Sequence, residues 1–146
     1  MQKIIVKGQP QGKLRARHGK NPWTGKPQTY TPEKTRAYEE LIGIEYQVQH
    51  GAYFADKYVR LYVLAFYGIP KSYTKSKQQQ AREGTLRPSV KPDADNIIKA
   101  VADALNGVAY DDDTQVVEVL CKKYYSDDPR IEIYIEEAKA QKEARS

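Results

Sequence analysis

Residues 58–68, with the sequence YVRLYVLAFYG, are rich in β-branched and aromatic side chains. In the second half of this run apolar side chains occupy consecutive positions, so both faces of a strand formed here are apolar. Strands of that kind lie inside a sheet, where packed layers cover both of their faces. The segment therefore predicts a central β-strand, and the rest of the chain must supply the elements that cover it.

The remaining segments predict a mixed pattern of helices and strands. Strands are predicted at residues 3–8, 114–125 and 130–136, and helices at residues 31–49, 74–82 and 96–106. The order β-α-β-(α)-α-β-β predicts an α/β or α+β fold, with a mixed sheet and helices packed on it. A chain of 146 residues suits one such domain with a single core.

Three segments fall outside this pattern. Residues 11–30 are basic and broken by glycine and proline, which predicts a loop or arm, and residues 71–91 contain a second basic loop. Residues 137–146 predict a charged tail, a fraying helix end. No apolar run is long enough to cross a membrane, and the N-terminus has no secretory signal pattern. The single cysteine, Cys121, suits a reducing cytoplasm and excludes an internal disulfide.

Charge is distributed unevenly along the chain. Residues 1–91 hold 17 Lys and Arg against 6 Asp and Glu, whereas residues 92–146 hold 7 against 13. Two basic segments and one acidic segment suggest a polyanionic ligand and a cation that lets the acidic groups approach it. A basic surface that serves solubility alone is the alternative that charge leaves open.

The acidic residues gather around one short predicted helix in the segment KPDADNIIKAVADALNGVAYDDDTQVVEV, residues 91–119. Asp93 and Asp95 converge if the chain is extended there and the helix begins after Asp93, with Asp95 as the expected N-cap. Lys99 then lies one turn above Asp95 on the same helix face. After the turn at Gly107, one of the acids in residues 111–113 can reach the aspartate pair if the helix and the next strand are neighbours.

Converging carboxylates without histidine or cysteine form a site for Mg²⁺ or Mn²⁺. In a basic protein, such a site predicts metal-assisted phosphodiester cleavage, with Lys99 stabilising negative charge or orienting water. A structural explanation stands beside this one: Asp93 and Asp95 cap a helix, Lys99 pairs with Asp95 and Asp103, and residues 111–113 form a solvated turn. The joint occurrence of these features beside two basic segments favours the nuclease.

The motif KPDADNIIKAVADALNG, followed by YDDDTQVVEVLCKKY and RIEIYI, closely resembles the RusA family of Holliday-junction resolvases, small endodeoxyribonucleases often encoded by phages and prophages. The family pattern is Pro-Asp-x-Asp-Asn-x-x-Lys, a helix ending in Ala-Leu-Asn-Gly, and then Asp-Asp-x-Gln-Val-Val. The segments GQPQGKLRAR and YTPEKTRAYEE also look like the start of the family. The resemblance covers nearly the whole chain.

This resemblance implies a RusA-like fold and specific roles for the acidic residues. It implies that Asp93, Asp95 and Asp113 bind Mg²⁺, that Lys99 is the essential lysine, and that Asp112 assists. This chain has three acids where the family usually has two. The resemblance further implies a homodimer that resolves four-way DNA junctions by paired nicks, in recombination and repair, in the cytoplasm of a bacterial cell at the nucleoid.

The basic segments supply the predicted contacts with branched DNA. These are long cationic side chains that can follow phosphates in a flexible arm: Lys13, Arg15, Arg17, Lys20, Lys75, Lys77 and Arg82. Trp23 and Tyr73 either stack on unpaired bases or pack as ordinary loop and core residues. No functional role is expected for Cys121 or His50. The alternatives to a junction resolvase are a non-catalytic nucleic-acid-binding module and a nuclease that prefers flaps or single strands.

Overall fold

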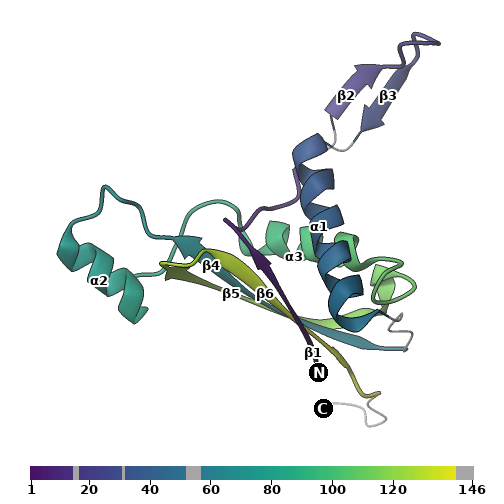
Figure 1. Ribbon diagram of the computed structural model, residues 1–146. Helices are drawn as coiled ribbons and strands as arrows, with labels where there is room; N and C mark the ends of the chain where they lie inside the picture. The colour runs from purple at the N-terminus through teal and green to yellow at the C-terminus, as the bar shows by residue number, and fades with distance from the viewer. Residues whose placement is uncertain (15–16, 31, 52–56, 141–146) are drawn as a thin grey trace, which may run out of the picture.

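The fold is built on a four-stranded mixed sheet in an α+β domain. The computed structural model describes residues 1–14, 17–30, 32–51 and 57–140 (Figure 1). The strands run in the order β1 (Gln2–Lys7), β6 (Arg130–Glu137), β4 (Val59–Gly68) and β5 (Val116–Ser126). β4 is antiparallel to β6 and parallel to β5. The predicted central position of residues 58–68 is confirmed, since β4 has a neighbour on each side.

Helices cover one face of this sheet. The long helix α1 (Glu33–His50) and the motif helix α3 (Ala94–Leu105) pack against each other and on the same face, whereas the short helix α2 (Lys75–Glu83) lies at one end, against β5 (Figure 1). Alternate strand residues and one stripe from each helix form the core. Its fully buried aliphatic side chains include Ile4, Leu61, Val63, Ile131, Ile133, Ile135, Ile42, Ile97 and Leu105.

The predicted strands and helices are confirmed, with boundaries that differ by a few residues. The predicted short helix of the second basic segment is α2: Thr74 caps it by accepting from Lys77 N, and Gly84 ends it in the left-handed conformation. The predicted helical tail is not helical over residues 138–140, and residues 141–146 lie outside the described residues. None of the described helices is long and apolar enough to span a membrane.

The prediction of a loop over residues 11–30 is wrong for part of that segment. β2 (Arg17–Lys20) and β3 (Pro27–Tyr30) pair as an antiparallel hairpin that stands beyond the start of α1 (Figure 1). Hydrogen bonds in its turn hold it: the Asn21 side-chain oxygen accepts from the backbone N–H groups of Trp23 and Thr24. Since its strands lack apolar alternation, only the turn residues distinguish this hairpin from a loop.

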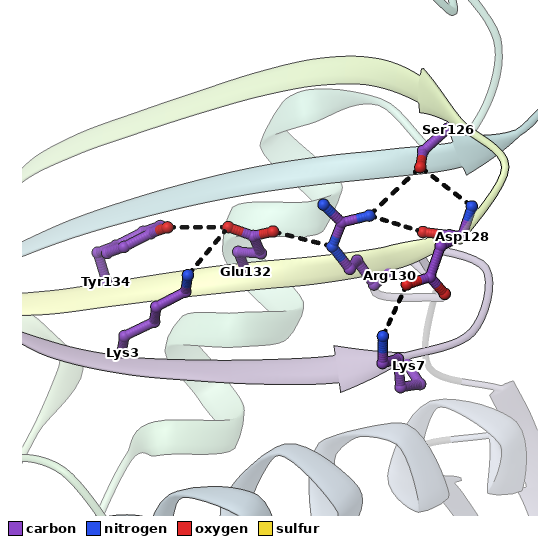
Figure 2. A network of polar contacts seen from close by, with 7 residues as sticks. All are labelled: Lys3, Lys7, Ser126, Asp128, Arg130, Glu132 and Tyr134. Atoms are coloured by element: carbon purple, nitrogen blue, oxygen red, sulfur yellow. Dashed lines mark hydrogen bonds and ion pairs between the residues drawn. The ribbon is translucent and has the colours of Figure 1, made fainter. Parts of the chain in front are cut away.

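The face of the sheet opposite to α1 and α3 carries polar and aromatic side chains. On it Glu132 accepts hydrogen bonds from Tyr134 Oη and Arg130 Nε, both at 2.8 Å, and forms an ion pair with Lys3 (Figure 2). Only 8% of Glu132 is exposed. The predicted alternation of residues 130–136 is therefore confirmed, because the isoleucines point into the core. On the other face, Glu132 is nearly buried and belongs to this network of polar contacts.

Candidate active site

The start of α3 presents the first two predicted catalytic aspartates to solvent. Asp93 is the N-cap, with extended backbone at φ −70° and ψ 157°, and the helix begins at Ala94. A helix that begins after Asp93 is therefore confirmed, whereas the assignment of Asp95 as the N-cap is wrong, because Asp95 lies inside the first turn. Both carboxylates are exposed, and the positive end of the helix dipole stabilises their charges.

One face of α3 continues from this pair toward the C-terminal end of the helix. Lys99 lies four residues after Asp95 and Asp103 four residues after Lys99, so the three lie above one another on the helix surface. Lys99 is exposed and makes no ion pair with any residue in the described ranges. The structural explanation in which Lys99 pairs with Asp95 and Asp103 is therefore wrong in this structure, and the ammonium group of Lys99 remains available to a ligand.

The acidic run at residues 111–113 leads into a short 3-10 helix, η1 (Asp113–Gln115). Gln115 Oε1 accepts from the backbone N–H groups of Asp111 and Asp112, at 2.8 and 3.0 Å. The Asp112 carboxylate in turn accepts from Thr114 Oγ1 at 3.1 Å. Asp112 and Gln115 thus form a reciprocal cap, which gives the DD-x-Q pattern a structural role.

Asp113 lies beside Asp112 and Asp103. The pKa of Asp113 is raised above its ordinary value by a hydrogen bond shared with Asp112, by partial burial, and by the charge of Asp103. The pKa of Asp112 is lowered, chiefly by the hydrogen bond from Thr114 and then by that from Asp113. These carboxylates therefore compete for a proton, and a cation bound near them would relieve their repulsion.

The three predicted metal ligands lie in two places along the length of α3, because Asp113 belongs to η1 and packs beside the later part of that helix. Asp93 and Asp95 lie at its start, whereas Asp113 contacts Asp103, eight residues beyond Asp95 and hence about 12 Å along the helix axis. Over the described ranges, no three His, Cys, Asp or Glu side chains are placed to hold one ion. The Asp93–Asp95 pair still fits Mg²⁺, because this ion is commonly bound by one or two carboxylates together with waters and substrate phosphates.

The segment that we call the strap, residues 8–14, crosses the start of α3. Gly68 N donates to Gln9 Oε1 at 3.1 Å, Lys13 N to Asn96 O at 3.1 Å, and Leu14 N to Thr35 Oγ1 at 3.3 Å. These bonds tie the strap to β4, α3 and α1 in turn. The strap therefore fixes the start of α1 relative to the aspartates.

Lys13 anchors the end of the strap. Its ammonium group bonds to Glu39 of α1 and, at 3.1 Å, to Asp103 of α3, and only 20% of its side chain is exposed. Burial alone would lower the pKa of Lys13, but the hydrogen bonds to Glu39 and Asp103 outweigh it and raise the pKa. The charge of Lys13 is directed at two carboxylates within the protein, and contact of Lys13 with DNA stays a prediction. No pattern in the sequence indicates a role for Glu39, whereas the helical spacing from Asp95 and Lys99 places Asp103 on this face.

The other predicted DNA contacts lie on the hairpin and α2. Lys20 and Lys75 are exposed, Lys77 lies 4.0 Å from the centre of the Tyr73 ring, and Arg82 pairs with Asp127. Arg15 lies outside the described residues, and of Arg17 the structure describes only the backbone, in β2. DNA contact by these side chains stays a prediction.

The two aromatic candidates differ sharply in their surroundings. Trp23 is 92% exposed in the turn of the hairpin, where it is free to stack on a base. Tyr73 packs against the edge of the core, with its hydroxyl 3.3 Å from that of Tyr125, as the ordinary packing alternative predicted. His50 contacts the backbone carbonyl of Lys3, and burial raises the pKa of the Cys121 thiol.

We expect Gly12→Ala to destabilise the protein and disturb this site, because a Cβ atom at Gly12 would lie 2.9 Å from the Cβ atoms of both Asn96 and Pro92. The crowded atoms are the Cβ atom of a helical residue and a ring carbon of a proline, and neither can rotate away, so the strap itself must shift. Overpacking of this kind costs about 1–3 kcal/mol. Urea unfolding measures it.

Gly43→Ala is the matched control for this substitution. Its Cβ would have neighbours at 3.6 Å and 3.8 Å, which is ordinary contact, and Gly43 lies inside α1. Alanine is the better helix former, so this variant should gain roughly 0.5–1 kcal/mol in the free energy of unfolding. Equal stability of the two variants would show that the strap does not press on α3.

Two comparisons with known proteins cover the segments that carry this site. The family described as "Endodeoxyribonuclease RusA" matches residues 7–136, which include the strap, α3 and η1. The chain is also similar to the "Uncharacterized protein YqaN" of Bacillus subtilis (strain 168), with 33% identity over 138 residues that cover 93% of this chain and 92% of the relative. The match to the family takes in every element that carries the candidate site. The chain belongs to the RusA family of endodeoxyribonucleases.

Proposed function

We propose that this protein is a structure-selective endodeoxyribonuclease that resolves Holliday junctions by Mg²⁺-dependent paired cleavage. The observation that carries the proposal is the start of α3, where Asp93 and Asp95 are exposed together and Lys99 follows one turn later on the same face. Membership of an endodeoxyribonuclease family supplies the reaction class. The protein would act in recombination and repair, on DNA in the bacterial cytoplasm.

In this proposal Asp93 and Asp95 would hold the ion. Asp113, the third ligand that the family resemblance implies, lies beside Asp103 in this structure and would have to approach the other two when the ion binds. A bound Mg²⁺ supplies charge neutralisation at the phosphate and a water of lowered pKa. Asp93 and Asp95 contribute hard oxygen ligands on a helix terminus that the strap and the core keep rigid. Lys99, which is unpaired within the described ranges, can orient water or stabilise negative charge that develops on the phosphate.

Paired cleavage requires two sites, and one chain carries one Asp93–Asp95 pair. We therefore propose a homodimer, in which a two-fold axis relates two such pairs as it relates the two equivalent strands of a four-way junction. The basic hairpin stands beyond the start of α1 and α2 lies at one end of the sheet (Figure 1), so the two extend in different directions, which suits contacts with more than one DNA arm. Such contacts read backbone shape and not base sequence.

The proposal is tested on four DNA substrates of matched sequence: a four-way junction, a flap, a duplex and a single strand. In Mg²⁺ we expect the junction to be cut fastest, with symmetric nicks in two strands and no cleavage in EDTA. Denaturing gels measure the nicks, and gel shifts measure the binding. Preferred cutting of flaps or single strands would favour a nuclease of other specificity, and binding without metal-dependent turnover would favour a non-catalytic module.

A further inference from the structure

A cavity of about 450 Å³ opens between the strap and the start of α3. Pro10, Gly12 and Leu14 of the strap line one side, and Pro92, Asp93 and Asn96 line the other. Its size falls within the range of pockets that enclose small ligands or ligand segments. Because Asp93 belongs to the lining, anything bound there lies directly beside the proposed cleavage site.

The charges of the cavity select an anion. Lys13, Lys34 and Lys91 all line it, against the single carboxylate of Asp93. Lys13 is occupied by Glu39 and Asp103, whereas Lys34 and Lys91 are exposed and make no ion pair within the described part of the chain. Lys34 belongs to the first turn of α1 and Lys91 immediately precedes Pro92, so the two lysines reach the cavity from different segments, and each can approach a phosphate oxygen as a point charge.

The lining of the cavity also includes apolar side chains. Pro10, Leu14 and Pro92 offer carbon surface to a ligand that alternates charged and uncharged parts. A deoxyribose-phosphate chain has that character, whereas a free inorganic anion would leave the apolar walls unused. The strap is held at both ends by hydrogen bonds, so the cavity has a fixed wall.

We propose that this cavity binds the backbone of the DNA strand that is cut, at the nucleotide next to the scissile phosphate, with Lys34 and Lys91 as its phosphate contacts. This proposal rests on the proposed function in one respect, namely that the bound strand is the one that is cleaved. Binding of the strand in the cavity requires no catalysis. It assigns to Lys34 and Lys91 the role of positioning the strand so that the adjacent phosphate meets Asp93 and Asp95.

The first test measures affinity for a synthetic four-way junction in EDTA as a function of salt, so that no cleavage occurs. Each lysine–phosphate contact contributes about 0.9 to the slope of log K against log salt. The double variant Lys34→Gln/Lys91→Gln should therefore lower the magnitude of the slope by roughly 2. Lys122→Gln is the matched control, since Lys122 is exposed on the opposite face of the sheet and should leave the slope unchanged. Circular dichroism confirms folding.

A second measurement locates the contact. Single phosphates of the junction are replaced in turn by neutral methylphosphonates, and affinity is measured again in EDTA. One short run of positions should weaken binding to the wild-type protein severalfold but leave the double variant unaffected, and these positions should adjoin the nicks mapped in Mg²⁺. Two results would overturn the proposal. The first is a double variant whose slope of log K against log salt equals that of the wild-type protein, and the second is a double variant whose binding is weakened by the same methylphosphonates as wild-type binding.

Failure of the cavity and failure of the proposed function have different signatures. A wild-type protein that cuts no DNA in Mg²⁺ refutes the nuclease, while the salt slope and the methylphosphonate positions still decide whether the cavity holds DNA. A protein that cuts junctions normally after both lysines are replaced, with an unchanged salt slope, refutes the cavity alone.

Discussion

Asp95→Asn should reduce junction cleavage by more than about a hundredfold and leave junction affinity in EDTA equal to or higher than that of the wild-type protein. Loss of an outer partner of a metal ligand typically costs 10- to 100-fold, so loss of a ligand should cost more. Affinity is spared because the variant removes a negative charge that faces the phosphates. Asp95 is exposed and makes no described side-chain contact, so its replacement should leave folding intact.

The measurement is a denaturing gel for cleavage beside a gel shift for binding, on the same junction. Asp127→Asn is the control, because Asp127 is an exposed acid on the loop after β5 that pairs with Arg82. Cleavage by Asp95→Asn at the wild-type rate would defeat the assignment of the site. Asp93→Asn and Lys99→Ala should behave like Asp95→Asn.

The comparison of Asp113→Asn with Asp103→Asn addresses the third predicted ligand. Asp113 contacts Asp103 in this chain and lies away from Asp95. The two variants therefore distinguish a metal-binding role of Asp113 from a structural role of its neighbour Asp103. If Asp113 reaches the ion, its replacement should abolish cleavage, whereas Asp103→Asn should mainly loosen Lys13 and the strap. Equal and small losses would limit the metal site to Asp93 and Asp95.

The sequence was most informative where side-chain period and local caps determine structure. Alternation located β6, consecutive apolar residues located β4, and Thr74 and Gly84 bounded α2. The β2–β3 hairpin was not predicted, because its strands bury no apolar face and are held by hydrogen bonds in the turn. Such bonds leave a weaker trace in sequence than a buried face does.

The candidate site was predictable in its residue types and less so in its geometry. The spacing of Asp93, Asp95 and Lys99 places all three at the start of one helix, with Lys99 one turn after Asp95 on the same face. The position of Asp113 depends on how η1 packs against α3, and this follows from the Asp112–Gln115 cap and the contact with Asp103. The role of Lys13 depends on Glu39, which is 26 residues away in sequence, and no local pattern encodes that contact.

Glu132→Gln should destabilise the protein by about 3 kcal/mol at neutral pH, the largest stability effect that we expect from a single polar substitution on the open face of the sheet. Glu132 is nearly buried and bonds to Arg130, Tyr134 and Lys3 (Figure 2). Removing one partner of a buried ion pair costs about 3–5 kcal/mol, because the remaining charges lose their compensation. A glutamine also turns an amide N–H₂ toward groups that are themselves donors.

Glu118→Gln is the matched control, on the same face and in the neighbouring part of the sheet. Glu118 pairs with Arg60, but 45% of its side chain is exposed. Water therefore solvates its carboxylate and weakens the electrostatic stabilisation that the ion pair contributes. Its loss should cost less than about 1 kcal/mol. Urea unfolding of the two variants at pH 7 therefore separates the contribution of burial from that of ion pairing as such.

The stabilisation contributed by the Glu132 carboxylate depends on pH. Burial alone would raise the pKa of Glu132, but hydrogen bonds from Tyr134 and Arg130 and the charge of Lys3 outweigh it, so the folded-state pKa is lowered. The stabilisation is therefore fully present above the unfolded-state pKa of about 4.3 and is lost as the pH falls through the lower folded-state value. The stability difference between the wild-type protein and Glu132→Gln should accordingly be constant from pH 7 to about pH 5 and shrink below about pH 4. A difference that persists unchanged into acid would assign the cost to packing of the side chain and not to its charge.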